Sequence, residues 1–302
     1  MFKKIIVALV LGFLIGAGIV FFLIPGTLTV ISLHTVASSM PGTYRFLAND
    51  SSWRYRLNCE GTNLTISRKI SSALQISNAT PLTEEVTTLL LLQSHPDSIR
   101  LKWETRYQAG LDPFQRIINY RKAIKFKACM NSILETADDY LQQNEHLYGF
   151  RISRTTLTDT FLVAVRFETR NYPETEMIYS RIDQVKNYIA ASGAREMNDP
   201  MLNITSNDNG SKTVTVGIAT NTQVKDSGIF VTRRLAQYKN RTLTTLVTGD
   251  NKKVEESLRA IHQYMEDYHL TSPTVHFELL ITDRRKEKDA SKWVTRIFYP
   301  IV

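Results

Sequence analysis

An uninterrupted apolar run near the N-terminus constrains this chain more than any other feature. The run covers residues 5–24 and follows Lys3 and Lys4. About twenty residues at helical rise reach about 30 Å, which is the thickness of the hydrocarbon core of a bilayer. A helix of this length satisfies its own backbone hydrogen bonds in lipid. The sequence therefore predicts a transmembrane anchor over residues 1–26.

The charges around the run predict its orientation. Lys3 and Lys4 precede it, and the next Lys or Arg is Arg45. The positive-inside rule then keeps the N-terminus cytoplasmic and the rest of the chain extracytoplasmic, which means periplasmic in a bacterium. A cleaved signal peptide is the alternative, although its apolar region would be shorter, about 7–15 residues. Gly12 and Gly16 have a spacing that allows close approach of two helices, so a homodimer through this face stays open.

The composition after the anchor is that of folded domains. Hydrophobic residues make up 43% and charged residues 22% of the chain, and its length suffices for one large or two ordinary domains. The net charge of +8 is scattered. The basic group from Arg116 to Lys127 lies on a predicted helix, where it either contacts anionic lipid or forms a solvated face. No helix-turn-helix, zinc-finger or RNA-stacking motif accompanies the charge, which argues against a nucleic-acid partner.

Motifs for catalysis, metals and cofactors do not occur in the sequence. We find no G-x-S-x-G, H-E-x-x-H, C-x-x-C or phosphate-loop pattern, and the six histidines are dispersed without metal-ligand spacing. Cys59 and Cys129 are the two cysteines. An extracytoplasmic location would permit a disulfide between them, but two cysteines do not fix one. The sequence thus predicts no catalytic residue, no metal site and no cofactor.

Residues 27–148 are predicted to form a strand, a short helix, several strands and one long helix. Thr, Val and Ile dominate residues 28–36, which is typical of a strand, and Ser38 or Ser39 can cap the short helix. Residues 99–107 alternate apolar and charged side chains, as a half-buried strand does. Asp112-Pro113 starts a helix that is predicted to run to about Tyr148. The stripe predicted to face the sheet is Ile117, Ile124, Ala128, Leu134 and Leu141.

This arrangement resembles the START-like (SRPBCC) superfamily, in which a curved antiparallel sheet wraps around a long C-terminal helix. The resemblance rests on Trp53-Arg54-Tyr55, on the Trp103 strand followed by Asp112-Pro113-Phe114, and on the helix end Leu147-Tyr148-Gly149-Phe150. It implies a helix-grip domain over residues 27–148. Such domains usually enclose an apolar cavity, but the sheet predicted here is short, so a shrunken domain without a cavity is the alternative.

Residues 149–302 are predicted to repeat one β-α-β-β unit. The two predicted helices follow Pro173 and Gly249-Asp250, and both have apolar residues at helical spacing. Two such units give an α+β domain with two helices on one face of a sheet, and the other face is left to line a groove. The predicted strands are 157–169, 213–219, 229–235, 242–248, 275–282 and 293–302.

This layout resembles the GyrI-like small-molecule-binding family, which also supplies the effector-binding domain of several multidrug-responsive regulators. The residues that carry the resemblance are Asp199-Pro200-Met201-Leu202-Asn203, Thr248-Gly249-Asp250, residues 275–281 and Phe298-Tyr299-Pro300-Ile301. The resemblance implies that residues 149–302 bind a small molecule.

Glu278 is the predicted anchor of that ligand. The alternation of its strand predicts that Phe277 and Leu279, with Val275 and Ile281, face the helices, whereas Glu278 faces the groove with its neighbours of the same parity. A carboxylate among aromatic side chains suits a lipophilic cation, and the resemblance implies a glutamate at the centre of the drug pocket. The predicted ligand-binding residues are Glu278, His276, Leu280, Met201 and Asn203.

Three functions stay open at this point. The first is an extracytoplasmic, membrane-anchored protein that senses or sequesters an apolar or cationic ligand without catalysis. The second is a hydrolase of reactive xenobiotics with Glu278 as general base, since some relatives pair a tyrosine with this glutamate. Leu280 stands where that tyrosine is frequent, and Asn203 or Ile204 replaces a frequent aromatic, so a tyrosine within hydrogen-bond distance of Glu278 would be needed to favour hydrolysis. The third is a structural envelope protein.

Overall fold

The chain is described by a computed structural model that covers residues 2–49, 58–59, 62–70, 72–78, 86–95, 97–158, 160–235 and 239–302. It divides into two compact units, Met1–Gln143 and Asn144–Val302. Each unit combines helices with one antiparallel sheet, so the fold is α+β as predicted. The predicted Trp53-Arg54-Tyr55 segment lies outside the described residues.

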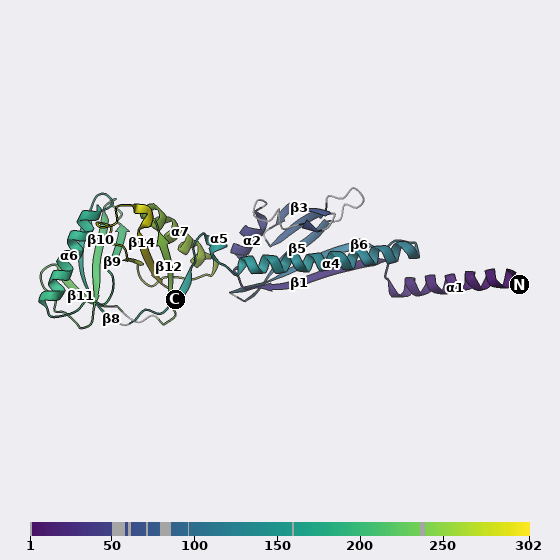
Figure 1. Cartoon of the computed structure of the whole chain (residues 1–302), viewed down its shortest axis with the longest axis horizontal. Helices are drawn as coiled ribbons and strands as arrows, with labels where there is room; N and C mark the ends of the chain where they lie inside the picture. Colours follow the sequence, from purple (N-terminus) through teal and green to yellow (C-terminus); the bar gives the residue numbers. More distant parts are fainter. Residues whose placement is uncertain are drawn as a thin grey trace. The chain divides into compact units, whose positions relative to one another are not determined.

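The first unit consists of an N-terminal apolar helix, a sheet and a long helix packed along that sheet (Figure 1). The strands are ordered β1-β6-β5-β4-β3-β2. The elements are α1 (Phe2–Leu23), β1 (Thr27–Val36), α2 (Met40–Ala48), β2 (Asn58–Cys59), β3 (Thr62–Ile70), β4 (Ala73–Asn78), β5 (Val86–His95), β6 (Ser98–Gln108) and α4 (Pro113–Leu141).

Helix starts in this unit follow the predicted caps. The Ser39 hydroxyl accepts a hydrogen bond from the backbone N–H of Gly42 at the start of α2. The Asp112 carboxylate accepts one from the N–H of Phe114, and Pro113 occupies the first turn of α4. These side chains satisfy N–H groups that have no partner within the helix.

The buried face of α4 differs from the predicted stripe. Leu134 and Leu141 are buried as predicted, whereas Ile124 and Ala128 are exposed and Ile117 is half-buried. The prediction was wrong at these positions because a different set with the same helical spacing faces the sheet. That set is Ala123, Phe126, Met130, Ile133, Leu134, Ala137 and Leu141.

The core of the first unit is filled by side chains from sheet and helix. Trp103 on β6 is fully buried, and its indole N–H donates to the Thr87 hydroxyl at 2.6 Å. The Phe126 ring of α4 packs edge-on against Trp103, with ring centroids 6.3 Å apart. These contacts place α4 directly on the sheet. The START-like assignment itself stays a prediction.

The long helix ends earlier than predicted. Helix α4 stops at Leu141, and a separate short helix, α5 (Glu145–Tyr148), belongs to the second unit. The prediction of a single helix to Tyr148 was therefore wrong. The break was missed because residues 142–144 contain no Gly or Pro. Gly149 ends α5 with φ of 76°, the left-handed conformation that glycine commonly adopts at the end of a helix.

The second unit contains one sheet, most of whose strands are labelled in Figure 1. The strand order is β11-β8-β10-β9-β13-β14-β12-β7. The order β-α-β-β occurs in β8, α6, β9 and β10, and again in β12, α7, β13 and β14. The elements after α5 are β7 (Ser153–Thr155), β8 (Thr160–Thr169), α6 (Thr175–Ala191), β9 (Met201–Ser206), β10 (Lys212–Thr220), β11 (Phe230–Leu235), β12 (Thr242–Thr248), α7 (Asn251–Asp267), β13 (Phe277–Leu280), a 3₁₀ turn η1 (Ala290–Lys292) and β14 (Val294–Pro300).

The predicted strands misplace β11 in the sheet and omit β7 and β9. Strand β11 pairs with β8, so it does not begin the second run as predicted. Strand β9 was not among the predicted strands, yet it pairs with β10 on one side and with β13 on the other. The pairing of β9 with β13 joins the two runs at the middle of the sheet, and this is where the candidate site lies.

Candidate functional site

Glu278 lies at the seam between two hydrophobic cores. In the register of β13 it pairs with Leu202 on β9 and with Ile297 on β14. Leu202 belongs to the core that includes α6, and Ile297 belongs to the core that includes α7. Directly paired residues in antiparallel strands point to the same face of a sheet. Glu278 therefore lies on the face that both helices cover, between their two cores.

The predicted facing of β13 was wrong. Leu280 is 3% exposed and packs in the core with α6, so the helix-covered face carries Leu280 and Glu278. Phe277 and Leu279 lie on the opposite face, where Phe277 stacks on Phe298 with centroids 5.1 Å apart. Both faces of this strand are rich in apolar residues, so alternation alone could not assign the core face.

Met201 and Asn203 do not lie on the same face of the sheet as Glu278. They alternate along β9 with Leu202, which faces the helices, so they point to the opposite face of the sheet. The Asn203 amide donates to the backbone carbonyl of His276 at 2.7 Å. Asn203 therefore holds the chain just before β13 and has a structural contact there.

His276 occupies the same side of the sheet as Glu278. Its ring stacks on Tyr299, with centroids 5.6 Å apart, and Tyr299 packs against the core with α7. Burial lowers the pKa of His276, and the nearby His262 lowers it further. Of the predicted site residues, the structure thus brings together Glu278, His276 and Leu280.

The carboxyl group of Glu278 is buried without a partner. The side chain is 4% exposed, and its Oε2 atom has no hydrogen-bond partner in the described part of the chain. Burial raises the pKa of Glu278 to about 7; the charge of Glu255 also raises it, and Arg284 opposes the rise. Native proteins seldom leave a buried carboxylate unpaired, because its desolvation is then uncompensated.

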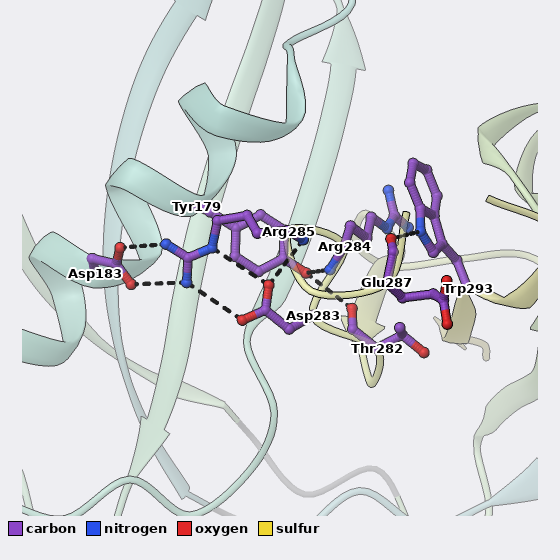
Figure 2. A network of polar contacts seen from close by, with 8 residues as sticks. All are labelled: Tyr179, Asp183, Thr282, Asp283, Arg284, Arg285, Glu287 and Trp293. Atoms are coloured by element: carbon purple, nitrogen blue, oxygen red, sulfur yellow. Dashed lines mark hydrogen bonds and ion pairs between the residues drawn. The ribbon is translucent and has the colours of Figure 1, made fainter. Parts of the chain in front are cut away.

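Arg284 brings a buried cation close to Glu278. Its guanidinium donates to Asn251 Oδ1 at 2.7 Å and to Thr295 Oγ1 at 3.0 Å. It also lies 4.9 Å from the centroid of the Trp293 ring, and both side chains are drawn in Figure 2. Thr295 pairs with Leu280, one step along the face from Glu278. The partners recorded for Arg284 in the described residues are neutral, so its charge lowers the pKa of Glu278 without a direct ion pair.

The loop that carries Arg284 is fastened to α6. The Tyr179 hydroxyl donates to the carbonyl of Thr282 and accepts from the N–H of Arg284, both at 2.9 Å (Figure 2). Arg285 pairs with Asp183 on α6 at 2.7 Å. Because these contacts fix the loop at both its backbone and its side chains, Arg284 is held in place beside the seam.

Tyr172 is a tyrosine near Glu278, whereas position 280, where the resembled family frequently has a tyrosine, is a leucine here. It precedes α6, and burial strongly raises its pKa, followed by the negative charge of Glu278. Arg284 hydrogen-bonds to Tyr172 and opposes that rise. Sequence reasoning identified Tyr172-Pro173 only as a helix start and missed Arg284, since a charged loop carries no periodic pattern.

A cavity of about 320 Å³ lies elsewhere in this unit, at the start of α7, and Glu278 does not line it. Within the residues that the structure describes, no group of three His, Cys, Asp or Glu side chains could hold a metal ion. The residues that line the cavity are Thr248, Gly249, Asp250, Lys253, Ala290 and Ser291.

No protein-family model matches this chain, and no curated protein matches it. Similar solved structures include EcmrR in a DNA complex within EcmrR-RPo, at 17% identity over 62% of this chain and 70% of that chain, with a TM-score of 0.45. The EcmrR C-terminal domain has 14% identity over 51% and 98%, with a TM-score of 0.44. SAV2435 bound to tetraphenylphosphonium has 14% identity over 51% and 93%, with a TM-score of 0.31. Since every score is under 0.5, these likenesses carry no argument about family, ligand or activity, and the GyrI-like resemblance stays a prediction.

Proposed function

We propose that this chain is a membrane-anchored, extracytoplasmic protein whose second unit binds an apolar or cationic small molecule without transforming it. The observation that carries the proposal is the unpartnered carboxyl oxygen of Glu278, buried between two helix-covered cores. An acidic group in this position is destabilising when it is ionised and alone. A cationic ligand would supply the missing partner in a region of low dielectric constant, where charge attraction is strong.

Neighbouring groups favour a ligand with aromatic or apolar parts. Tyr172 lies close enough to Glu278 for the charge of Glu278 to raise the pKa of Tyr172, and an aromatic face beside a cation adds about 0.5–2 kcal/mol. Arg284 directs its donors to Asn251 and Thr295. The oxygen of Glu278 is therefore left for the ligand, while Arg284 keeps the carboxyl group partly ionised near neutral pH.

The proposed anchor is α1. It is the one helix of the described residues that is long and apolar enough to cross a membrane, although a signal sequence has the same length and composition. Lys3 and Lys4 precede its apolar run, and Cys129 is disulfide-bonded; both support an extracytoplasmic location for the residues after α1. Protease added to intact spheroplasts then digests the chain beyond Gly26, and protection until lysis reverses the orientation. A homodimer through Gly12 and Gly16 remains a separate prediction.

A hydrolase is the second candidate, and Tyr172 is the observation that favours it. A glutamate with a pKa of about 7 is in the range of a general base. However, the hydrogen bond recorded for the Tyr172 side chain joins it to Arg284 and not to Glu278. If hydrolysis occurs, Glu278→Gln and Tyr172→Phe should both abolish turnover of a reactive ester, whereas a binding protein shows no turnover before mutation.

The decisive experiment for binding is calorimetric titration of the full chain in detergent. The probes are tetraphenylphosphonium and the neutral triphenylphosphine oxide, and the variants are Glu278→Gln and the control Glu266→Gln, which changes an exposed acid of α7. Loss of a buried charge-assisted contact is worth about 1.5–3 kcal/mol, so Glu278→Gln should weaken cation binding about 10- to 100-fold. The neutral probe and the control variant should change much less. Equal cation affinity in wild type and Glu278→Gln would sink the role of Glu278.

A further inference from the structure

The start of α4 carries an exposed apolar surface. Leu111, Phe114 and Ile118 are 92%, 62% and 51% exposed. Phe114 and Ile118 lie one turn apart, on the side of α4 opposite the buried Ala123 and Met130. We name the surface formed by Leu111, Phe114 and Ile118 the α4 tip. Contiguous exposed apolar surface of this kind marks a contact with a protein or a membrane.

Contacts with α1 indicate which of these two the surface meets. The Phe114 ring stacks on Phe13 with centroids 6.1 Å apart, and Phe13 lies near the middle of α1 (Phe2–Leu23). If α1 spans a bilayer, a side chain stacked against the middle of α1 lies below the surface of that bilayer. The α4 tip is thus continuous with the apolar surface of the proposed anchor.

Arg116 fixes this geometry. Its guanidinium donates to the carbonyl of Ile24 at 2.7 Å and to that of Gly110 at 2.9 Å, and it lies 4.0 Å from the centroid of the Phe21 ring. The last carbonyls of a helix have no partner within the helix, and a cation there interacts favourably with the helix dipole. Arg116 therefore ties the end of α1 to the start of α4, which keeps the α4 tip at the anchor.

The same outward line of α4 becomes basic beyond the tip. Arg121 and Lys125 continue the spacing of Phe114 and Ile118, and both are exposed, as is Lys122. Seven residues of helix advance by about 10 Å, so Arg121 lies about 10 Å along the axis from Phe114. An apolar end followed by exposed cations matches the order of acyl chains and anionic headgroups in a membrane.

From these observations we infer that the α4 tip inserts into the bilayer beside α1, with Arg121, Lys122 and Lys125 at the level of anionic headgroups. The inference rests on the proposed anchoring by α1. It assigns a lipid contact to the first unit in addition to a single crossing helix, so the unit is held at the membrane surface by two elements.

The test uses the full chain in vesicles of phosphatidylcholine with a minority of phosphatidylglycerol. Leu111→Cys and the control Ser132→Cys are labelled with an environment-sensitive fluorophore, and Cys129 does not compete because it is disulfide-bonded. Ser132 is exposed on the same outward line, about 27 Å farther along the axis of α4 than Phe114. A nitroxide on the lipid acyl chains should quench the label at position 111 several-fold more strongly than the label at position 132. Iodide in the water should show the reverse preference.

The outcomes separate this inference from the anchor. A chain that alkaline washing strips from the vesicles overturns both the anchor and the insertion. A chain that resists washing, but whose label at position 111 is quenched by lipid no more than the label at position 132, retains the anchor and overturns the insertion. Protection of position 111 from both quenchers also overturns it, since a second copy of the chain then covers the tip.

Discussion

In the first unit, strand β1 turns Ser32 and His34 toward α4. The Ser32 hydroxyl donates to Asn131, and His34 Nε2 is 3.0 Å from Asp138 Oδ2. In the second unit, strand β13 turns Glu278 toward the helices, but its side chain has no hydrogen bond within the described residues. Its Oε2 is buried without a partner, as is Asp138 Oδ1, although the other oxygen of Asp138 contacts His34. Polar groups that meet across a sheet and a helix complete a core, whereas a buried carboxyl group without a partner marks a place for something that is absent.

The largest effect is expected where the first unit is most completely packed. Trp103→Ala removes a fully buried ring and leaves the Thr87 hydroxyl without its indole donor. Loss of such a side chain costs about 3–5 kcal/mol of unfolding free energy. Denaturant unfolding followed by a probe in the first unit measures this loss, and tetraphenylphosphonium binding by the second unit should not change.

Ile124→Ala is the control for this variant, because Ile124 is exposed on α4 and its truncation should change stability by less than about 0.5 kcal/mol. If Trp103→Ala lowered the free energy of unfolding by less than about 1 kcal/mol, the contrast between the two units would fail. The first unit would then be loosely packed beneath α4.

Glu278→Gln should have the next largest effect, with a pH dependence that identifies its cause. The folded-state pKa is about 7, above the ordinary value of 4.5, so the folded protein holds the proton more tightly than the unfolded chain. The contribution of Glu278 to the free energy of unfolding is greatest below about pH 4.5 and falls as the pH rises to about 7. Above pH 7 the amide variant should therefore be more stable, by up to about 3 kcal/mol.

Thermal or denaturant unfolding of wild type and Glu278→Gln between about pH 4 and pH 8 tests this prediction. The quantity that matters is the difference between the two proteins, because other titrating groups contribute equally to both. A difference that stays constant with pH, or that favours wild type at pH 8, would show that Glu278 is partnered in the folded protein.

The sequence predicted elements wherever a local pattern and a cap agreed. Strand β12 (Thr242–Thr248) was placed with its correct bounds, because it contains only Thr, Leu and Val, and because Gly249-Asp250 ends the strand and caps the following helix. The end of α4 was missed because residues 142–144 contain no helix breaker. A pattern of residue types thus located elements better than it located their ends.

The site could be predicted only in part, for a physical reason. Glu278 was identified as the anchor, but its strand has apolar residues on both faces, and alternation assigned the acid to the wrong one. A carboxylate on the core face conflicts with the pattern that the rest of the core follows, and such conflicts are expected at functional sites. Tyr172 and Arg284 reach the site from loops, so only the register and the fold bring them near Glu278.

Cation affinity should rise with pH if an ionised Glu278 is the anchor. With a pKa of about 7, the ionised fraction increases about tenfold between pH 6 and pH 8, which corresponds to about 1.4 kcal/mol of binding free energy. Titrations with tetraphenylphosphonium at the two pH values measure the change, and triphenylphosphine oxide serves as the uncharged control. A pH-independent affinity for the cation would mean that some other group holds it.

The smallest predicted effect concerns Asp138, the carboxylate of the first unit that contacts His34. Its test is the same change from acid to amide that is proposed for Glu278. Asp138→Asn keeps the shape of the side chain but weakens its contact with His34, whose side chain is 27% exposed while that of Asp138 is 17% exposed. A partly buried hydrogen bond of this kind contributes about 1 kcal/mol, so the variant should be less stable by about that amount near neutral pH.

The substitution of acid by amide should thus destabilise the first unit and stabilise the second. Unfolding of Asp138→Asn, Glu278→Gln and the double variant measures both signs in one series, and the two effects should add because the sites share no partner. If Asp138→Asn were as stabilising as Glu278→Gln, neither carboxyl group would be distinguished by its pairing, and the absence of a partner at Glu278 would no longer point to a ligand.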